Sequence, residues 1–197
     1  VYAEEAVADE LLERLLAATR KVTVGDPTRR EVWMGPLIND AAARKFESSS
    51  ERLAAGGARI LCGGTRLDDG ELAHGHFVAP TLAEAPPEHP LFGEELFVPI
   101  LMVARVRDLA EGVAHANASE LGLTAGCYGD EDDLRYFCEH IEAGVLYLNR
   151  PQGATTGAWP GYQAFGGWKG SGSTGKAIGS AYYLPLYLRE QWQTTVE

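Results

Sequence analysis

The sequence is short of basic residues and contains no long apolar run. Lysine and arginine number 17 against 28 aspartate and glutamate residues, which gives a formal net charge of −11 at pH 7. An acidic surface of this kind repels phosphate backbones, so we expect no nucleic-acid partner. A membrane-spanning helix needs about 20 consecutive apolar residues. Because the sequence has no such run, we expect no membrane segment.

Cysteine is scarce, and Cys62, Cys127 and Cys138 lie far apart. No Cys-x-x-Cys pair occurs, which argues against a zinc site and against a dithiol redox pair. Each cysteine has apolar neighbours, so we expect all three to be small buried residues rather than nucleophiles. Unpaired cysteines are typical of a reducing compartment, and we therefore expect a cytoplasmic protein.

An initiator methionine, a signal peptide and a tag are also absent, since the chain opens on Val1-Tyr2. We expect a portion of a longer protein; a processed but complete protein is the alternative. With 45% hydrophobic and 23% charged residues, the composition is that of a globular protein rather than a disordered one. A chain of this length buries roughly 70% of its unfolded surface, so it needs no disulfide or metal to hold its core.

Hydrophobic periodicity and capping residues predict alternating helices and strands. In the first half, the predicted elements are a helix over residues 4–21, a helix capped by Asn39 and ended by Gly56-Gly57, a strand over Arg59–Cys62, and an extended segment over residues 76–82 that Pro80 marks as irregular or as a sheet edge.

Residues 97–148 have the clearest organisation. The predicted elements are a buried strand over residues 97–106, a helix from Asp108 to Asn117, a buried strand over residues 123–128, a helix capped by Asp130 with Leu134, Phe137, Cys138 and Ile141 on its apolar face, and a strand over Val145–Leu148. Parallel strands require such crossovers, so the predicted fold is α/β, with a mostly parallel sheet and helices on its faces.

The character of the sequence changes after Asn149. Residues 150–176 are dense in Gly, Ser, Thr and Pro, and a loop of this length in a compact domain is usually functional. From Ala181 onward the chain is apolar and aromatic. This tail is either a last strand that closes the core or an arm that pairs with the sheet edge of a partner subunit.

Two familiar motifs are incomplete. Residues 170–176 fit seven positions of a phosphate-binding P-loop, but Ala177 stands where a serine or threonine holds Mg²⁺, and no strand is predicted before the loop. We therefore expect a flexible turn rather than a nucleotide-hydrolysing site. His74 and His76 flank Gly75 in a polar loop, where a solvated turn is a better interpretation than a metal site.

Two other segments favour ligand binding. Glu94-Glu95 precedes Phe97: a carboxylate can accept both hydrogen bonds of a vicinal diol, and an aromatic face can cover a flat heterocycle. A charged turn is the alternative. In the long loop, small residues around Gly157 expose backbone N–H groups that can bind an anion, and Phe165 and Trp168 can wall a pocket. A plain linker is the alternative there.

Taken together and in order, short motifs along the whole chain resemble the C-terminal part of the aldehyde dehydrogenase superfamily. They are Gly25-Asp26-Pro27, Gly35-Pro36-Leu37-Ile38, Pro80-Thr81, Glu94-Glu95-Leu96-Phe97-Val98-Pro99, Ala116-Asn117, Gly122-Leu123, Ala143-Gly144, Asn149 and residues 165–172. The features that look most like the 1-pyrroline-5-carboxylate (glutamate semialdehyde) dehydrogenase branch are Asn149-Arg150, Thr156-Gly157-Ala158, Phe165-Gly166-Gly167 and the tail rich in tyrosine and leucine.

The resemblance implies an NAD(P)-dependent enzyme of proline catabolism that oxidises an aldehyde to a carboxylate. In the family a cysteine thiolate attacks the aldehyde, and a glutamate-activated water releases the acid. That cysteine, that glutamate and the main cofactor-binding domain precede the segment that Val1-Tyr2 resembles. None of the three cysteines here takes the nucleophile's place, so we expect no catalytic residue in these 197 residues and no activity of the isolated chain.

The resemblance also assigns roles at the cofactor and substrate. Glu95 resembles the carboxylate that binds the nicotinamide-side ribose of NAD or NADP, Phe97 the aromatic beside the nicotinamide, and Lys45 a weaker cofactor contact. At the substrate, Gly157 and Ala158 resemble the loop whose backbone N–H groups anchor the substrate carboxylate. Phe165 resembles the aromatic residue that lines the aldehyde tunnel.

The resemblance divides the chain into a catalytic domain over residues 1–182 and an oligomerisation arm over residues 183–197, which implies a homo-oligomer. Val98 stands where the family usually has glycine, Ala164 where it usually has proline, and residues 151–155 lengthen the loop before the carboxylate anchor. An aldehyde dehydrogenase of other specificity therefore stays open, as does a non-catalytic interaction module with the same fold.

Overall fold

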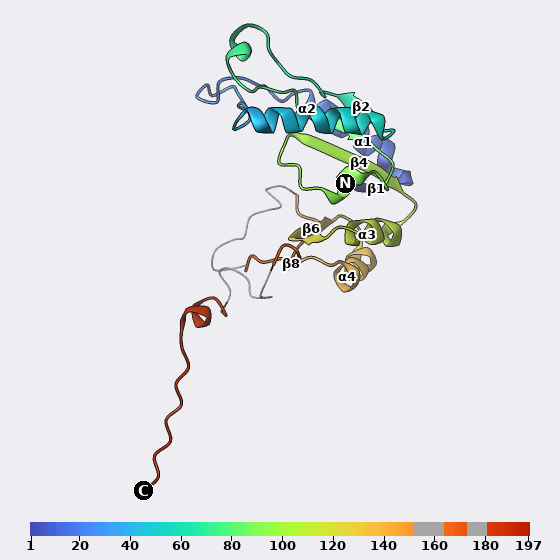
Figure 1. The fold of residues 1–197 in the computed structure, drawn as a ribbon. Helices are drawn as coiled ribbons and strands as arrows, with labels where there is room; N and C mark the ends of the chain where they lie inside the picture. Colours follow the sequence, from blue (N-terminus) through green and yellow to red (C-terminus); the bar gives the residue numbers. More distant parts are fainter. Residues whose placement is uncertain (152–163, 173–180) are drawn as a thin grey trace. The chain divides into compact units, whose positions relative to one another are not determined.

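A four-stranded sheet organises residues Val1–Ala118, the first of two units into which the chain divides. The computed structural model describes residues 1–151, 164–172 and 181–197 (Figure 1). The strands lie in the order β1-β4-β3-β2, with bounds Tyr2–Glu4, Ile100–Val106, Thr81–Glu84 and Arg59–Cys62. β4 runs parallel to both β1 and β3, and only β2 is antiparallel. The predicted α/β class with a parallel-rich sheet is confirmed.

Helices α1 (Glu5–Thr19) and α2 (Asp40–Ala55) pack on opposite faces of this sheet. Successive strand residues point to opposite faces, and the two apolar clusters follow that alternation. Leu82 and Val103 pack with Leu12 of α1. Ala83 and Met102, their neighbours in β3 and β4, pack with Leu53 of α2. The central strands are therefore covered on both sides, which explains the long apolar run that predicts β4.

Helix α2 begins where its capping residue predicts. The Asn39 side chain accepts a hydrogen bond from the Ala42 N–H at 2.9 Å, and Phe46 and Leu53 are fully buried. The helix ends at Gly56 because His89 packs there: a Cβ on Gly56 would lie 2.6 Å from His89 Cδ2. The fixed ends and buried face hold the outward side chains of α2 in place.

Two strand predictions in this unit need correction. β4 begins at Ile100 rather than at Phe97, which instead has a φ of 53° and is 84% exposed. β3 follows Pro80 and lies between β2 and β4, so it is an interior strand rather than an edge. Proline immediately before the strand removes no hydrogen bond from the ladder of the strand itself.

Two short strand pairs lie in the described residues of the unit Ser119–Glu197. β5 (Leu121–Gly122) pairs antiparallel with β8 (Trp168–Lys169), and β6 (Thr124–Cys127) pairs parallel with β7 (Val145–Leu148). Helix α4 (Glu131–His140) makes the crossover between β6 and β7, and Asp130 caps it as predicted, with Asp133 completing a capping box. Helix α3 (Leu109–Asn117), at the end of the first unit, is likewise capped by Asp108.

Several burial predictions are wrong. Cys127 is buried as expected, but Cys62 is half-buried and Cys138 is exposed. Cys127 is also the one fully buried residue of β6. Among the residues of helix α4, Phe137 is buried and the others are exposed or half-buried. A periodic pattern gives the direction of an apolar stripe but not its width.

The polar loops and the tail also differ in detail from the predictions. His74 ends a 3₁₀ helix η1 (Gly70–His74), and β8 directly precedes Gly170, where no strand was predicted. In the tail, η3 (Leu184–Tyr187) is followed by exposed chain, so within residues 181–197 no strand closes the core. No helix in the described ranges has the length and apolarity needed to cross a membrane.

An ion-pair network on β3 predicts acid sensitivity of the first unit. Glu84 accepts hydrogen bonds from Arg105 and Arg59, each at 2.6 Å, and Arg105 also donates to Asp9 at 2.5 Å. These bonds, with Arg105 the larger cause, lower the pKa of Glu84. A lowered pKa in the folded state contributes stability above the unfolded-state pKa, and that contribution is lost as the pH falls through the folded-state value.

We therefore expect Glu84→Gln to be less stable than the wild type at pH 7, with the difference shrinking as the pH falls through the lowered pKa of Glu84. Urea unfolding at pH 7 and at a series of acidic pH values measures this difference. The matched control is Glu88→Gln, a change at an exposed carboxylate. A stability difference that stays the same down to the acid end would contradict the role of the Glu84 charge.

Candidate functional site: a carboxylate presented beside helix α2

Two of the residues predicted to contact the cofactor, Glu95 and Phe97, lie in one short connection, and the third, Lys45, lies on helix α2. Residues Glu94 to Pro99 join the 3₁₀ helix η2 (Pro90–Gly93) to β4. Leu91, in η2, is buried and Leu96 packs against the same apolar cluster, so both ends of the acidic pair are anchored. Between these anchors the Glu94 backbone is extended, which turns neighbouring side chains to opposite sides.

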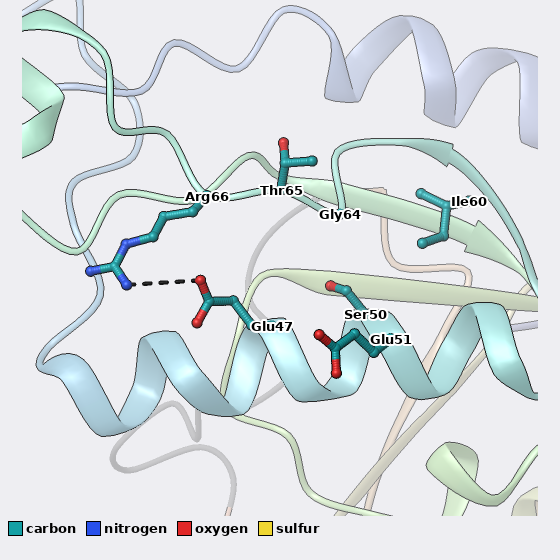
Figure 2. A pocket seen from close by; sticks show the side chains of 7 residues that line it. All are labelled: Glu47, Ser50, Glu51, Ile60, Gly64, Thr65 and Arg66. Carbon is teal, nitrogen blue, oxygen red and sulfur yellow. Dashed lines mark ion pairs between the residues drawn. The ribbon is translucent and has the colours of Figure 1, made fainter.

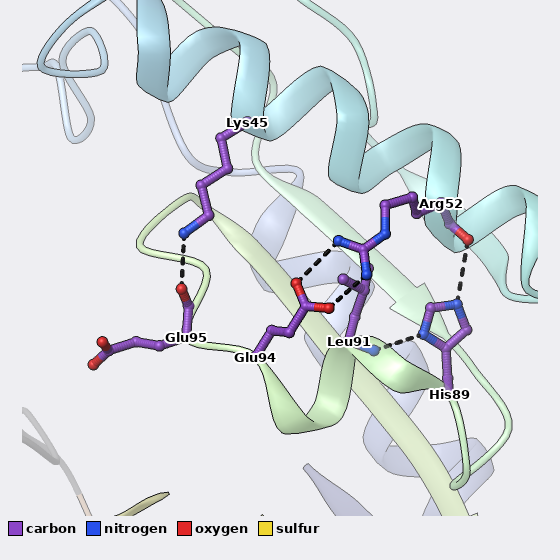
Figure 3. Close-up of polar contacts among 6 residues, drawn as sticks. All are labelled: Lys45, Arg52, His89, Leu91, Glu94 and Glu95. Carbon is purple, nitrogen blue, oxygen red and sulfur yellow. Dashed lines mark hydrogen bonds and ion pairs between the residues drawn. The ribbon is translucent and has the colours of Figure 1, made fainter. Parts of the chain in front are cut away.

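Helix α2 grips this connection with two cationic side chains (Figure 3). Lys45 Nζ donates to the Glu95 carbonyl oxygen at 2.8 Å. Arg52 forms two parallel bonds to Glu94, at 2.9 and 2.5 Å. The bonds from Arg52 lower the pKa of Glu94. The structure thus brings Lys45 and Glu95 together, and the contact is to the backbone of Glu95.

His89 adds a third link between η2 and α2. Its Nδ1 accepts the Leu91 N–H at 3.2 Å, and this hydrogen bond assigns the ring proton to Nε2. Nε2 then donates to the Arg52 carbonyl oxygen at 3.3 Å. The ring is 5% exposed, so the link is part of the packed core. Sequence analysis missed both His89 and Arg52; the available signal was that Lys45 and Arg52 share one helix face.

The Glu95 carboxylate itself points away from α2 (Figure 3). It is exposed, and within the described residues no hydrogen bond or ion pair involves it. Phe97 stands two residues further, 84% exposed, with a φ of 53° that non-glycine residues seldom adopt. A free carboxylate and a free aromatic face are the groups that a ribose diol and a flat heterocycle need. The residues present therefore fit a nicotinamide nucleotide.

The predicted substrate residues belong to the second unit. Gly157 and Ala158 lie outside the described residues. Phe165 is half-buried and is followed by Gly166-Gly167, against which Gly144 packs closely. Lys169 fixes the end of this segment, because its Nζ donates to the Ser119 carbonyl oxygen at 3.0 Å and pairs with Glu142 at 2.5 Å.

Asn149 marks the start of the loop that carries Gly157 and Ala158 in the sequence. It has a φ of 46°, in the left-handed region that asparagine tolerates better than most residues. Its side chain bonds both backbone groups of Gly129, at 3.0 and 2.9 Å. The Tyr128 hydroxyl donates to the Arg150 carbonyl oxygen at 2.6 Å. The chain therefore leaves β7 in a fixed direction.

A hollow lies beside α2 (Figure 2). Seven residues line it, namely Glu47, Ser50, Glu51, Ile60, Gly64, Thr65 and Arg66. Arg66 is already engaged by Glu47 at 3.8 Å and by His76 at 3.2 Å. At about 100° per helical residue, the lining residues of α2 face away from Lys45 and Arg52. The hollow mixes both charges and favours no class of ligand.

Metal-binding residues do not gather in the described part of the chain: no group of three or more His, Cys, Asp or Glu side chains converges there. His76 instead lies 3.2 Å from Arg66. The chemistry that the described residues support is thus hydrogen bonding to a polar, flat ligand at Glu95 and Phe97.

The chain matches known proteins along nearly its whole length. The model of the aldehyde dehydrogenase family matches residues 1–192. The 1-pyrroline-5-carboxylate dehydrogenase 1 of Halalkalibacterium halodurans is 35% identical over 185 residues, covering 93% of this chain and 34% of that protein. The 1-pyrroline-5-carboxylate dehydrogenase of Bacillus subtilis is 34% identical over 193 residues, covering 97% and 35%.

A solved structure gives the same result. The 1-pyrroline-5-carboxylate dehydrogenase from Thermus with bound NAD aligns with a TM-score of 0.85 at 36% identity, over 95% of this chain and 35% of that one. The chain thus spans about a third of the length of these relatives. The family and fold predicted from the ordered motifs are confirmed: the chain belongs to the aldehyde dehydrogenase family.

Proposed function

We propose that this chain is the C-terminal part of an NAD(P)-dependent dehydrogenase that oxidises glutamate semialdehyde, the open form of 1-pyrroline-5-carboxylate, to glutamate. The observation that carries the proposal is the 34–36% identity over almost the whole chain to proteins named for that substrate. One of them is a structure with bound NAD, and proline catabolism is the corresponding metabolic role.

In this proposal the first unit supplies part of the cofactor site. The nicotinamide cofactor takes up the hydride that leaves the substrate. Glu95 accepts hydrogen bonds from the ribose diol, Phe97 packs near the nicotinamide, and Lys45 holds the Glu95 backbone. The free carboxylate and the exposed aromatic support these roles.

The second unit supplies part of the aldehyde site. Gly157 and Ala158 bind the substrate carboxylate through backbone N–H groups, and Phe165 lines the approach of the aldehyde. Residues 1–182 form the catalytic portion, and residues 183–197 form an arm that joins subunits into a homo-oligomer in the cytoplasm. The exposed apolar tail supports the arm: Leu184 and Leu188 are 71% and 72% exposed, and Trp192 is 91% exposed.

The test compares two aldehydes on the full-length protein that carries this chain. 4-Aminobutanal is glutamate semialdehyde without its carboxylate, so it isolates the contribution of the carboxylate anchor. Losing charge-assisted hydrogen bonds costs about 1.5–3 kcal/mol, which corresponds to a kcat/KM about 10- to 100-fold lower for 4-aminobutanal. The measurement is initial rates of NADH or NADPH formation.

Each departure from this result has a distinct meaning. Equal kcat/KM values for the two aldehydes would contradict the carboxylate anchor and leave an aldehyde dehydrogenase of other specificity. No reduced cofactor with either aldehyde, from folded full-length protein, would contradict the dehydrogenase and support a non-catalytic module.

A further inference from the structure

We infer that Arg52 and Glu94 are positioning residues for the cofactor: their paired hydrogen bonds lock the connection that presents Glu95. The inference rests on the proposed role of Glu95 and deepens it. It concerns residues that touch neither cofactor nor substrate themselves.

The first step is the direction of the two carboxylates. Glu94 and Glu95 are adjacent, the backbone at Glu94 is extended, and the two side chains point apart (Figure 3). Pulling Glu94 towards α2 therefore turns Glu95 away from it. A carboxylate that turned back would meet Lys45, whose Nζ already lies 2.8 Å from the Glu95 carbonyl oxygen. The Arg52 bonds thus keep the Glu95 carboxylate available for a ligand.

The second step is the stiffness of the support. Arg52 and Lys45 stand seven residues apart on α2, hence on the same face of the helix. Phe46, which follows Lys45 and is 0% exposed, anchors this part of α2 in the core. His89 holds the Arg52 carbonyl oxygen at 3.3 Å. Arg52 is thus held by hydrogen bonds at its backbone, from His89, and at its side chain, to Glu94.

The third step separates this ion pair from an ordinary surface pair. Most exposed pairs contribute little, because two long side chains lose entropy on pairing. Arg52 uses both Nη atoms on both Glu94 oxygens, a geometry that fixes orientation as well as distance. Arg44, eight residues before Arg52 on α2, forms its described ion pair with Asp40 of its own helix. The Arg52 pair, unlike the Arg44 pair, connects α2 to the segment that carries Glu95.

The experiment is a double-mutant cycle in the full-length enzyme, with NAD affinity as the readout. Arg52→Ala and Glu94→Gln are each expected to raise the Kd of NAD about 3- to 5-fold, the upper range for exposed pairs. The double variant is expected to bind NAD with the same Kd as each single variant, because both substitutions remove the same interaction. The KM of the aldehyde stays at its wild-type value.

Arg44→Ala is the matched control, since it removes an exposed cation from the same helix without touching the connection. Its Kd for NAD is expected to equal that of the wild type. Thermal unfolding of each variant separates a positioning effect from a general loss of stability, which would lower the melting temperature without a specific change in NAD affinity.

Three results would overturn the inference. Unchanged NAD affinity in Arg52→Ala and Glu94→Gln, with weakened affinity in Glu95→Gln, would remove the positioning role and leave the proposed function standing. A double variant whose loss is the product of the two single losses would show that the residues act separately. Unchanged affinity in Glu95→Gln as well would overturn the proposed cofactor site together with the inference.

Discussion

Replacing Glu95 by glutamine in the full-length enzyme is expected to raise the KM for the nicotinamide cofactor about 5- to 100-fold. The amide keeps the size of the side chain but has one neutral oxygen acceptor instead of two charged ones, so it loses the charge-assisted bond of each diol hydroxyl to its own carboxylate oxygen. A neutral hydrogen bond contributes about 1 kcal/mol and one to a charged group about 1.5–3 kcal/mol, and each 1.4 kcal/mol is about tenfold in affinity.

The fold gives no reason for Glu95→Gln to unfold the protein. The carboxylate is exposed, and Lys45 binds the backbone oxygen of this residue, which the substitution retains. Glu88→Gln is the control, because it makes the same chemical change at an exposed carboxylate that precedes η2 in the sequence. Steady-state kinetics at saturating aldehyde measures the effect. A cofactor KM equal to that of Glu88→Gln would contradict the ribose-binding role.

Replacing Gly144 by alanine is expected to destabilise the second unit by about 3 kcal/mol, at the upper end of the usual cost of overpacking. A Cβ at this position would overlap the Gly166 carbonyl oxygen, and it would lie 2.8 Å from Gly166 C and 2.9 Å from Gly167 Cα. All of these are backbone atoms, which cannot swing aside as a side chain can. The segment that follows Phe165 would therefore have to move.

Gly126→Ala is the matched control for this prediction, because its Cβ would meet only Tyr147 atoms at 3.6 and 4.0 Å. Denaturant unfolding compares the two variants, and we expect Gly126→Ala to differ little from the wild type. Since displacement of residues 165–167 moves Phe165, we also expect Gly144→Ala to raise the aldehyde KM of the enzyme. Equal stability of the two alanine variants would refute the close approach of residues 144 and 166.

Local signals predicted the elements well where the physics is local. Asn39, Asp108 and Asp130 each cap the predicted helix, because a short polar side chain satisfies N–H groups only a few residues away. The parallel pairing of β6 and β7 across α4 is also confirmed, since a short helical crossover leaves few other arrangements. Phe97 was placed in a strand because an apolar residue before an apolar run carries no signal of its backbone angle.

The sequence did not predict the exposure of individual side chains or the pairing of residues far apart in the chain. Cys138 has the spacing of a buried residue and is exposed, because the width of the covering layer is a property of the other elements. Arg52 and Glu94 are 42 residues apart, and any exposed arginine is an equally good partner on charge alone. Their meeting depends on how η2 packs against α2, which His89 and Gly56 fix through shape.

The sequence by itself determined the family, the α/β class, the starts of α2, α3 and α4, and the choice of Glu95 and Phe97 as candidates, since these follow from local chemistry and from an ordered set of motifs. Only the tertiary structure decided that α2 holds the Glu94–Glu95 connection from one side and leaves the Glu95 carboxylate free on the other. The direction of a side chain depends on contacts between segments distant in the chain, and these form only when the core packs.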